Sequence, residues 1–308
     1  MNLITLTLNP AVDLHCQTDT FVPFHENLAD ITSRDLGGKG VNISRALFTN
    51  GIGSIPVILI GDESQAEFQE GLKTQIPKPV FFPAKGRVRE NITLHSKEGE
   101  TRISFRGFKA PADTLQKLSK YLQEFSLEDS VITFTGSIPG GICKEEAISF
   151  LMELKEKGAK LVIDSKSVTL EELLMIKPWL IKPNADEIQD YLGQKMSVEM
   201  LAEEAKRLHQ AGITNVMISL GEDGALLCSG EKVFHAEVPV IEAKSTIGAG
   251  DSTIAGFLAA YQKNPKIQAE ELLRMASAYG TAACLREGTL PPLSEDIEKV
   301  YKDIKLCD

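Results

Sequence analysis

The chain has 308 residues, enough for one large α/β domain or two smaller ones, and its composition of 43% hydrophobic and 25% charged residues is typical of globular proteins. This composition argues against wholesale disorder. A net charge of −10 argues against a nucleic acid or an anionic membrane as the main partner, so we predict neither. Any anionic substrate must then be held by local Arg and Lys groups.

The cysteines are dispersed and odd in number, and they form no CxxC pair. This pattern argues against a zinc site and against a disulfide framework, and it fits a reducing cytosol. The first residues lack a basic segment followed by an apolar run of signal-peptide length, and no segment approaches the length of a membrane span. We therefore expect a cytoplasmic protein.

Short apolar runs alternate with longer amphipathic runs along the chain. The predicted strands are 3–8, 56–60, 131–134, 161–163, 180–182, 216–220 and 225–228. The predicted helices are 41–50, 65–74, 112–125, 145–157, 198–211, 251–262 and 269–285. Such alternation predicts βαβ units and an α/β fold with a mostly parallel sheet, which binds ligands at the carboxyl ends of its strands.

Two stretches, about 13–37 and 87–107, interrupt this alternation. The second predicts a hairpin, in which residues 91–95 and 101–105 form the strands and Gly99 the turn. Inserted strands outside the main sheet could form a lid over its edge. We therefore predict a single domain over residues 1–308 that carries two lid insertions.

The segment Gly248-Ala249-Gly250-Asp251 directly precedes a predicted amphipathic helix. Glycines allow a tight turn and close approach to a ligand, and the free N–H groups of a helix start suit a phosphate or a developing anion. Asp251 stands where a carboxylate could accept the proton of an attacking hydroxyl. This combination suits phosphoryl transfer to an alcohol. The alternative interpretation is a glycine-rich turn capped by an aspartate.

Polar residues also follow the predicted strands. Asp13 and Asp164 each come after a strand, where a carboxylate could bind sugar hydroxyls or serve only as a turn residue. Gly37-Gly38-Lys39-Gly40-Val41-Asn42 opens a helix pattern, so its backbone could meet a sugar while Lys39 and Asn42 supply polar contacts. It is not a Walker A loop, because Gly40 follows Lys39 where Ser or Thr is needed. A flexible loop is the alternative.

Four arginines lie on the predicted lid: Arg87, Arg89, Arg102 and Arg106. Residues two apart on a strand share a face, so Arg89 and Asn91 can point together toward a cleft. Guanidinium groups suit a phosphate, although a solvated charged strand is the commoner explanation for any one of them.

Two further loops follow strands. In Lys182-Pro183-Asn184-Ala185-Asp186-Glu187, Asn184 and Glu187 are three residues apart and would share a helix face. Their oxygens could hold Mg²⁺ or its waters, or they could form a helix capping box, and the two roles are compatible. The glycine-rich turn of residues 219–225 could line an adenine nucleotide or could be a plain hairpin.

Together these segments resemble the pfkB family of ribokinase-like carbohydrate kinases. The similar segments, in family order, are 7–13, 37–42, 182–187 and 244–252. The resemblance implies a Rossmann-like core with a β-sheet lid that often mediates dimerisation, and hence a homodimer. It implies ATP and Mg²⁺, with Asp251 as the catalytic base and Gly248, Ala249 and Gly250 as an anion hole.

The resemblance also distributes the remaining site residues. It implies sugar contacts from Asp13, Gly37, Gly38, Lys39 and Asn42, and a contact between Arg89 and the phosphate already on the substrate. Further predicted substrate contacts are Asn91, Arg102 and Ser137. Predicted nucleotide contacts are Lys182, Asn184, Ser219, Gly221, Gly224, Thr246, Gly248 and Gly250. Asn184 and Glu187 are placed near Mg²⁺.

Within the family, the segment 86–94 (GRVRENITL) looks like the TRxN strand of the 1-phosphofructokinases, which convert ATP and D-fructose 1-phosphate to fructose 1,6-bisphosphate and ADP. Val88 replaces the usual Thr, and the segment 26–29 lacks the basic residue expected after Asn27. Both departures concern substrate contacts, so tagatose-6-phosphate kinases are the second candidate and 6-phosphofructokinases the third.

Two other classes of protein were weighed. A non-catalytic sugar-phosphate sensor could adopt the same fold. A sensor would not need the carboxylate of Asp251, so the presence of Asp251 argues against this class. A dinucleotide-dependent oxidoreductase is disfavoured because no GxGxxG follows the first predicted strand.

Overall fold

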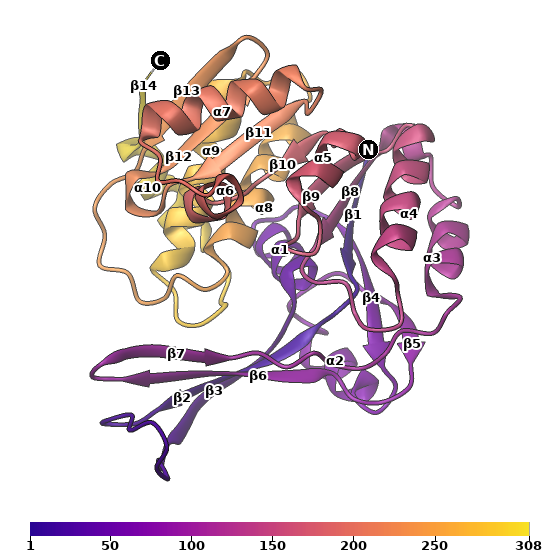
Figure 1. Ribbon diagram of the computed structural model, residues 1–308, viewed down its shortest axis with the longest axis vertical. Coiled ribbons are helices and arrows are strands. Elements are labelled where there is room, and N and C mark those ends of the chain that lie inside the picture. The colour runs from indigo at the N-terminus through magenta and orange to yellow at the C-terminus, as the bar shows by residue number, and fades with distance from the viewer. Residues whose placement is uncertain (308) are drawn as a thin grey trace.

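The computed structural model describes residues 1–307 and contains two sheets (Figure 1). The larger sheet has ten strands, and they run in the spatial order β14 (Lys305–Cys307), β13 (Lys232–Glu237), β12 (Ala225–Ser229), β11 (Asn215–Ser219), β10 (Leu180–Ile181), β9 (Lys160–Asp164), β8 (Ser130–Thr135), β1 (Asn2–Thr7), β4 (Ile55–Gly61) and β5 (Val80–Ala84). The strands from β11 to β5 pair in parallel, and β11 to β14 pair antiparallel. The predicted mostly parallel sheet is confirmed.

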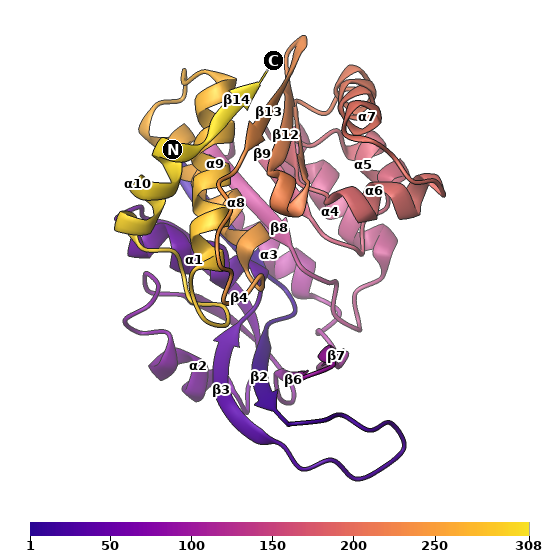
Figure 2. The same cartoon turned by 90° about the vertical axis from the view of Figure 1, so that its left-hand side faces the viewer.

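Helices cover both faces of this sheet, as Figure 2 shows. One layer comprises α1 (Lys39–Thr49), α8 (Ala249–Lys263), α9 (Ala269–Cys284) and α10 (Ser294–Asp303). The opposite layer comprises α3 (Thr114–Leu122), α4 (Lys144–Glu156), α5 (Leu170–Ile176), α6 (Ala185–Leu192) and α7 (Val198–Gln210). A short helix, α2 (Gln65–Gly71), lies beside β4 and β5. Within residues 1–307, no helix combines the length and the apolarity needed to cross a membrane.

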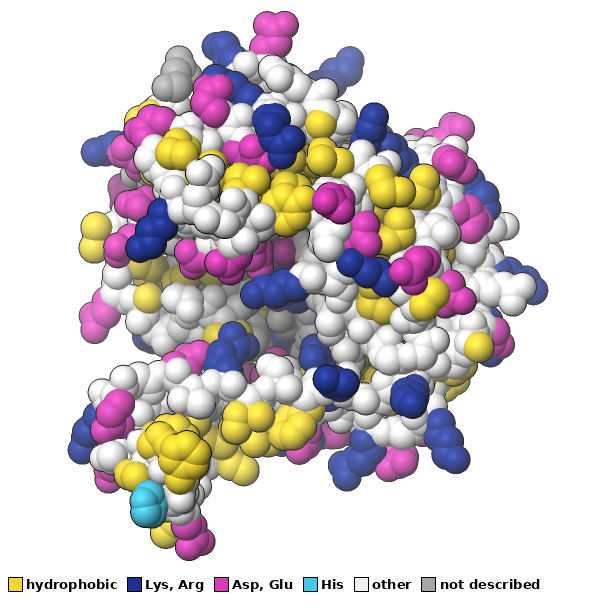
Figure 3. All heavy atoms as spheres, in the orientation of Figure 1, with side chains coloured by type: hydrophobic (Ala, Val, Ile, Leu, Met, Phe, Trp, Pro, Cys, Tyr) yellow, Lys and Arg dark blue, Asp and Glu magenta, His cyan; other side chains and the backbone are white. Residues whose placement is uncertain are grey.

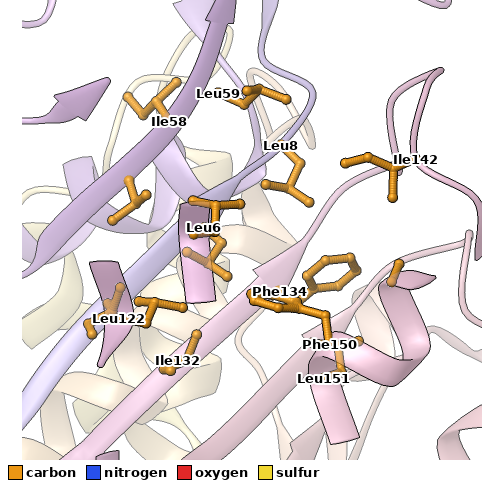
Figure 4. Packing of buried hydrophobic residues seen from close by; sticks show 14 of the residues in the cluster. Leu6, Leu8, Ile58, Leu59, Leu122, Ile132, Phe134, Ile142, Phe150 and Leu151 are labelled. Atoms are coloured by element: carbon orange, nitrogen blue, oxygen red, sulfur yellow. The ribbon is translucent and has the colours of Figure 1, made fainter. Parts of the chain in front are cut away.

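The central strands are apolar on both sides because each side faces a helix layer. Leu3 and Val131 point into the core shared with α1, α8 and α9, whereas their neighbours Ile4 and Ile132 point into the core shared with α3 and α4. Figure 4 shows the second core, where Leu6, Phe134 and Leu122 pack together with Phe150 and Leu151. The rigid sheet holds the carboxyl ends of its strands at one edge.

The second sheet is formed by the two interrupting stretches and projects from the body (Figures 1 and 2). Its order is β3 (Asp30–Gly37), β2 (Ala11–Gln17), β6 (Arg89–Ser96) and β7 (Gly99–Ile103), and we call it the lid. The predicted hairpin of β6 and β7 is present, and β2 pairs with β6 in parallel. Figure 3 shows a hollow between the lid and the body.

The register divides the lid into a polar face and an apolar face. Asp13, Asp35 and Asn91 share the face that carries the polar residues. The other face carries Leu14, Ile31, Ile92, Leu94 and Ile103. Ile31 and Ile103 are 66% and 51% exposed, and hydrophobic side chains gather on the lid in Figure 3. Such an apolar patch on a projecting sheet is typical of a protein interface.

The predicted helices and strands are present with small shifts in their ends. The predicted helix 65–74 ends at Gly71, and the predicted helix 112–125 covers only Thr114–Leu122. The first lid stretch was predicted as an insertion without assigned strands, and it forms β2 and β3; β5, α5, β13, α10 and β14 were not predicted either. β5 has only five residues and contains Pro83, which normally argues against a strand. The proline is tolerated because β5 is an edge strand.

We predict that the apolar face of the lid pairs with a second copy of the chain. Replacing Ile31 and Ile103 together by Glu places charges on that face, so the double variant should sediment as a monomer where the parent sediments as a dimer. Analytical ultracentrifugation at several concentrations measures this. The control is Met175→Glu, which changes an equally exposed residue on α5, away from the lid. A monomeric parent, or a double variant that still dimerises, would contradict the prediction.

Candidate active site

The N-terminus of α8 opens toward the hollow between the body and the lid. Gly248 has a positive φ of 79°, which side chains other than glycine adopt rarely, and α8 begins at the next residue. Ser252 N donates to Gly248 O over 2.9 Å, so the helix is formed from its first turn. The early amides have no intrahelical acceptor, and they create a site that favours anions.

Asp251 lies in that first turn and is only 6% exposed. Its Oδ2 accepts a hydrogen bond from Asn42 Nδ2 over 2.9 Å, so α1 and α8 meet at this carboxylate. Burial raises the pKa of Asp251 to about 6, although the charge of Lys39 and the bond from Asn42 act in the opposite direction. A carboxylate with this pKa is ionised at neutral pH, and it is a stronger base than an exposed aspartate.

A second buried carboxylate, Asp164 at the end of β9, is paired with two lysines. Lys39 Nζ lies 2.9 Å and Lys182 Nζ 3.9 Å from Asp164 Oδ2. Burial would raise the pKa of Asp164, but the charges of Lys182 and Lys39 outweigh burial and lower it. The pKa of Lys39 is raised, because the charges of Asp164 and Asp251 together exceed the effect of its burial. Lys39 therefore stays charged between two carboxylates.

Lys182 is also close to the glycine-rich turn. A Cβ built on Gly250 would stand 3.0 Å from Lys182 Nζ, so a side chain at position 250 would displace the ammonium. The glycine thus allows the Lys182 ammonium to lie beside the N-terminus of α8. The ammonium and the helix N-terminus both favour a negatively charged group at this place.

The lid contributes a polar cluster on its inner face. Asn91 Nδ2 donates to Asp13 Oδ1 over 2.9 Å, as expected for residues paired in the parallel register of β2 and β6. A Cβ on Gly37 would lie 3.4 Å from Asp13 Oδ2 and 3.3 Å from Asn42 Oδ1. Asp13, Gly37, Asn42 and Asp251 therefore form one continuous set.

Arg89 lies at the base of the lid. It donates from Nη1 to Phe105 O over 3.0 Å and from Nη2 to Asn9 O over 3.3 Å. Asn9 Nδ2 in turn donates to Ser137 Oγ over 2.9 Å, which brings the predicted substrate residue Ser137 to the same place. Burial lowers the pKa of Arg89, and its Nε is buried with no hydrogen-bond partner in residues 1–307. Each of Nη1 and Nη2 carries a second N–H that could donate to an anion.

Arg102 and Arg106 are not held against Arg89. Arg102 is exposed and lies 3.9 Å from Glu100 on the same strand, although its register opposite Thr93 places it on the face shared by Asn91. Arg106 is exposed, and only its carbonyl oxygen contacts the cluster, by accepting a bond from Asn9. Arg87 is exposed as well.

A cavity of about 620 Å³ adjoins the other side of the α8 N-terminus. Its lining includes the predicted nucleotide residues Asn184, Ser219, Gly221, Gly224, Thr246 and Gly250. Val238, Val240 and Ile241 supply apolar walls that suit a flat aromatic base. The cavity and the lid cluster therefore flank Asp251 and the adjacent anion site from opposite sides.

Asn184 and Glu187 form the capping box that was the alternative to a metal site. Asn184 Oδ1 accepts from Glu187 N over 2.7 Å, and Glu187 Oε2 accepts from Asn184 N over 3.1 Å. Glu187 Oε1 lies 3.5 Å from Nζ of the exposed Lys166. Within residues 1–307, no cluster of three or more His, Cys, Asp or Glu could hold a metal alone. Glu187 Oε1, which lies outside the capping box, still fits Mg²⁺, because this ion usually keeps several waters and binds substrate phosphates.

Asn9 was not predicted as a site residue, although its segment was. It joins Arg89, Ser137 and the lid end at Arg106. The only signal in the sequence was its place directly after a buried strand.

The chain is similar to known proteins over nearly its whole length. The sequence model described as "pfkB family carbohydrate kinase" matches residues 8–296. A tagatose-6-phosphate kinase from Staphylococcus epidermidis is 29% identical, with 99% of both chains covered. A 1-phosphofructokinase from Borreliella burgdorferi is 32% identical, with 99% of this chain and 98% of the relative covered. The crystal structure of phosphofructokinase-2 from Escherichia coli in complex with substrates and products superposes with a TM-score of 0.89 at 25% identity, covering 98% of this chain and 99% of that one.

The raised pKa of Asp251 predicts that this residue destabilises the fold at neutral pH. The unfolded chain ionises Asp251 near pH 3.8, whereas the folded protein ionises it near pH 6. Between these pH values the folded state binds more protons than the unfolded state, so raising the pH favours unfolding. Above pH 6 the ionised Asp251 lowers the free energy of unfolding by its full amount, about 3 kcal/mol.

Asp251→Asn should therefore raise the free energy of unfolding at pH 8 by an amount of this order, and the gain should vanish toward pH 4. Urea unfolding across that range, with Asp190→Asn on α6 as the control, measures it. A variant less stable than the parent at pH 8 would contradict the assignment of a raised pKa.

Proposed function

The chain belongs to the pfkB family of carbohydrate kinases, and we propose that it transfers the γ-phosphoryl group of ATP to the C6 hydroxyl of D-fructose 1-phosphate. The products are fructose 1,6-bisphosphate and ADP. The observation that carries the proposal is the position of Asp251: a buried carboxylate with a raised pKa, in the first turn of a helix, between a cavity and a polar lid cluster.

In the proposed reaction, the sugar lies between the lid and α1. Asp13 and Asn42 bind its hydroxyls, and Arg89, held at the base of the lid by Phe105 O and Asn9 O, binds the phosphate at C1. ATP occupies the cavity with its γ-phosphate at the N-terminus of α8, next to Lys182.

The C6 oxygen attacks the γ-phosphorus while its proton passes to Asp251 Oδ, and the bond from that phosphorus to the β–γ bridging oxygen breaks, leaving ADP. The amides of Gly248 to Asp251 and the ammonium of Lys182 stabilise the charge on the transferring group. Mg²⁺, held through the ATP phosphates and water near Asn184 and Glu187, would neutralise phosphate charge.

A tagatose-6-phosphate kinase is the alternative, supported by the Staphylococcus epidermidis relative. The fructose 1-phosphate assignment is favoured by the likeness of segment 86–94 to the 1-phosphofructokinase branch and by the Borreliella burgdorferi relative. A 6-phosphofructokinase is third, in line with the Escherichia coli structure. The three differ in the hydroxyls and the phosphate position that the lid must bind, whereas the base and the anion site are the same.

We predict that kcat/KM is highest for fructose 1-phosphate when ADP release is measured with Mg·ATP and each of fructose 1-phosphate, tagatose 6-phosphate and fructose 6-phosphate. Asp251→Asn serves as the blank and should lose turnover by at least about a hundredfold, because the proton has no acceptor. A preference for tagatose 6-phosphate would overturn the substrate and keep the mechanism. Full turnover by Asp251→Asn would overturn the base.

Arg89→Ala should raise KM for the sugar phosphate by about tenfold or more and leave KM for ATP within a few-fold, because the guanidinium lies at the base of the lid and does not line the cavity. Arg87→Ala is the matched control: it removes an exposed arginine two residues away and should change neither constant. Steady-state kinetics with each substrate varied in turn measures both. Equal effects of the two variants would remove Arg89 from the phosphate site.

A further inference from the structure

Arg45 on α1 is an arginine that none of the roles above requires. Its side chain is only 4% exposed, an uncommon burial for an arginine. It lies three residues after Asn42, so the two side chains share one face of the helix.

The guanidinium of Arg45 contacts two parts of the molecule. Nη2 donates to Leu36 O, near the end of the lid strand β3, over 2.5 Å. Nη1 donates to Asn42 Oδ1 over 3.4 Å. On its other side, Asn42 Nδ2 donates to Asp251 Oδ2 over 2.9 Å. A line of three contacts therefore runs from the lid backbone to the buried carboxylate.

The chemistry of this line fixes the direction of the Asn42 amide. A guanidinium has only donors, so it must face the amide oxygen, and the amide NH₂ is then turned toward Asp251. The opposite rotamer would place the amide oxygen against the carboxylate and the NH₂ against the guanidinium, and both contacts would be repulsive. Without Arg45, the contact with Asp251 alone would set the direction of the amide, and the amide oxygen would lose its donor.

We propose that Arg45 is a positioning residue, which holds the Asn42 amide as a donor to Asp251 and links this bond to the end of lid strand β3. The proposal rests on the proposed function in one respect, namely that Asp251 is the base. Arg45 itself touches neither the carboxylate nor the cavity.

The charged groups around this line define which substitution tests it. Lys39, Asp164 and Lys182 act on Asp251, and Asp35 and Asp13 act on Arg45. Arg45→Lys keeps the positive charge between these groups but loses the planar fork that reaches Leu36 and Asn42 together. The bond from Asn42 lowers the pKa of Asp251, so a free amide should let that pKa rise above about 6.

The test measures the Asp251 carboxyl directly and does not depend on turnover. Protein labelled with [4-¹³C]aspartate is titrated by NMR, and the Asp251 signal is assigned by its absence in Asp251→Asn. Arg45→Lys should raise the pKa of Asp251 by about one unit, and the acid limb of kcat should move with it. Turnover then falls about tenfold below pH 6 and recovers toward pH 8.5, with KM for ATP unchanged.

Three further variants distinguish a positioning role of Arg45 from a role in stability alone. Asn42→Ala alone should produce the same shift, and Arg45→Lys added to Asn42→Ala should produce no further shift. Arg274→Lys is the control, because Arg274 contacts Glu271 and Tyr301 on the α9–α10 side and should change stability without moving the titration.

An unmoved Asp251 titration in Arg45→Lys overturns the proposal, as does a shift that persists in the Asn42→Ala background. If Arg45→Lys does not fold, Asn42→Ala must still raise the pKa, and an unchanged value there overturns the proposal as well. Failure of the proposed function is distinguishable: Asp251→Asn would then keep full turnover while the NMR shifts in the other variants remained.

Discussion

The site is built around one buried carboxylate, at a point where three parts of the chain meet. Asp251 belongs to α8, its hydrogen-bond donor Asn42 belongs to α1, and Gly37 of the lid approaches both Asn42 and Asp13. A carboxylate withdrawn from water is costly unless donors and cations surround it. The same groups that offset this cost hold α1, α8 and the lid in a fixed relation, so the chemistry of the site and its architecture have one origin.

Two buried carboxylates share Lys39 yet differ in their protonation. The ammonium groups of Lys182 and Lys39 lie close to Asp164 and lower its pKa. The same ammonium groups also act on Asp251, but burial outweighs them there and keeps its pKa raised. Environments that separate two pKa values assign separate roles. Asp164 suits a permanent anion that anchors Lys39 and Lys182, and Asp251 suits a group that gains and loses a proton near neutral pH.

Much of this arrangement could be predicted from the sequence, because buried strands are apolar runs and the residues after them must meet at one edge. That reasoning located Asp164 and Lys182, whereas Asp13, which was expected to follow the first strand at this edge, lies within lid strand β2. The same reasoning could not find β5, where Pro83 argues against a strand unless the strand is known to be an edge. It also missed Arg45, because an arginine on an amphipathic helix normally points to solvent, and its burial is decided by the lid packed above it.

The way the lid is attached restricts how it can move. The chain passes between body and lid at four places, namely beside Pro10, Gly38, Gly86 and Gly107, and the three glycines have φ of 131°, 110° and 87°. Ala11, Gly37 and Arg89 are in register at the lid base, and Gly107 approaches Arg89, so these crossings lie together along one line. A stiff sheet joined to a body along one line has a single soft rotation, about a hinge. A side chain at Gly38 would collide with Thr7 and Pro10 of the body, so this crossing requires a glycine.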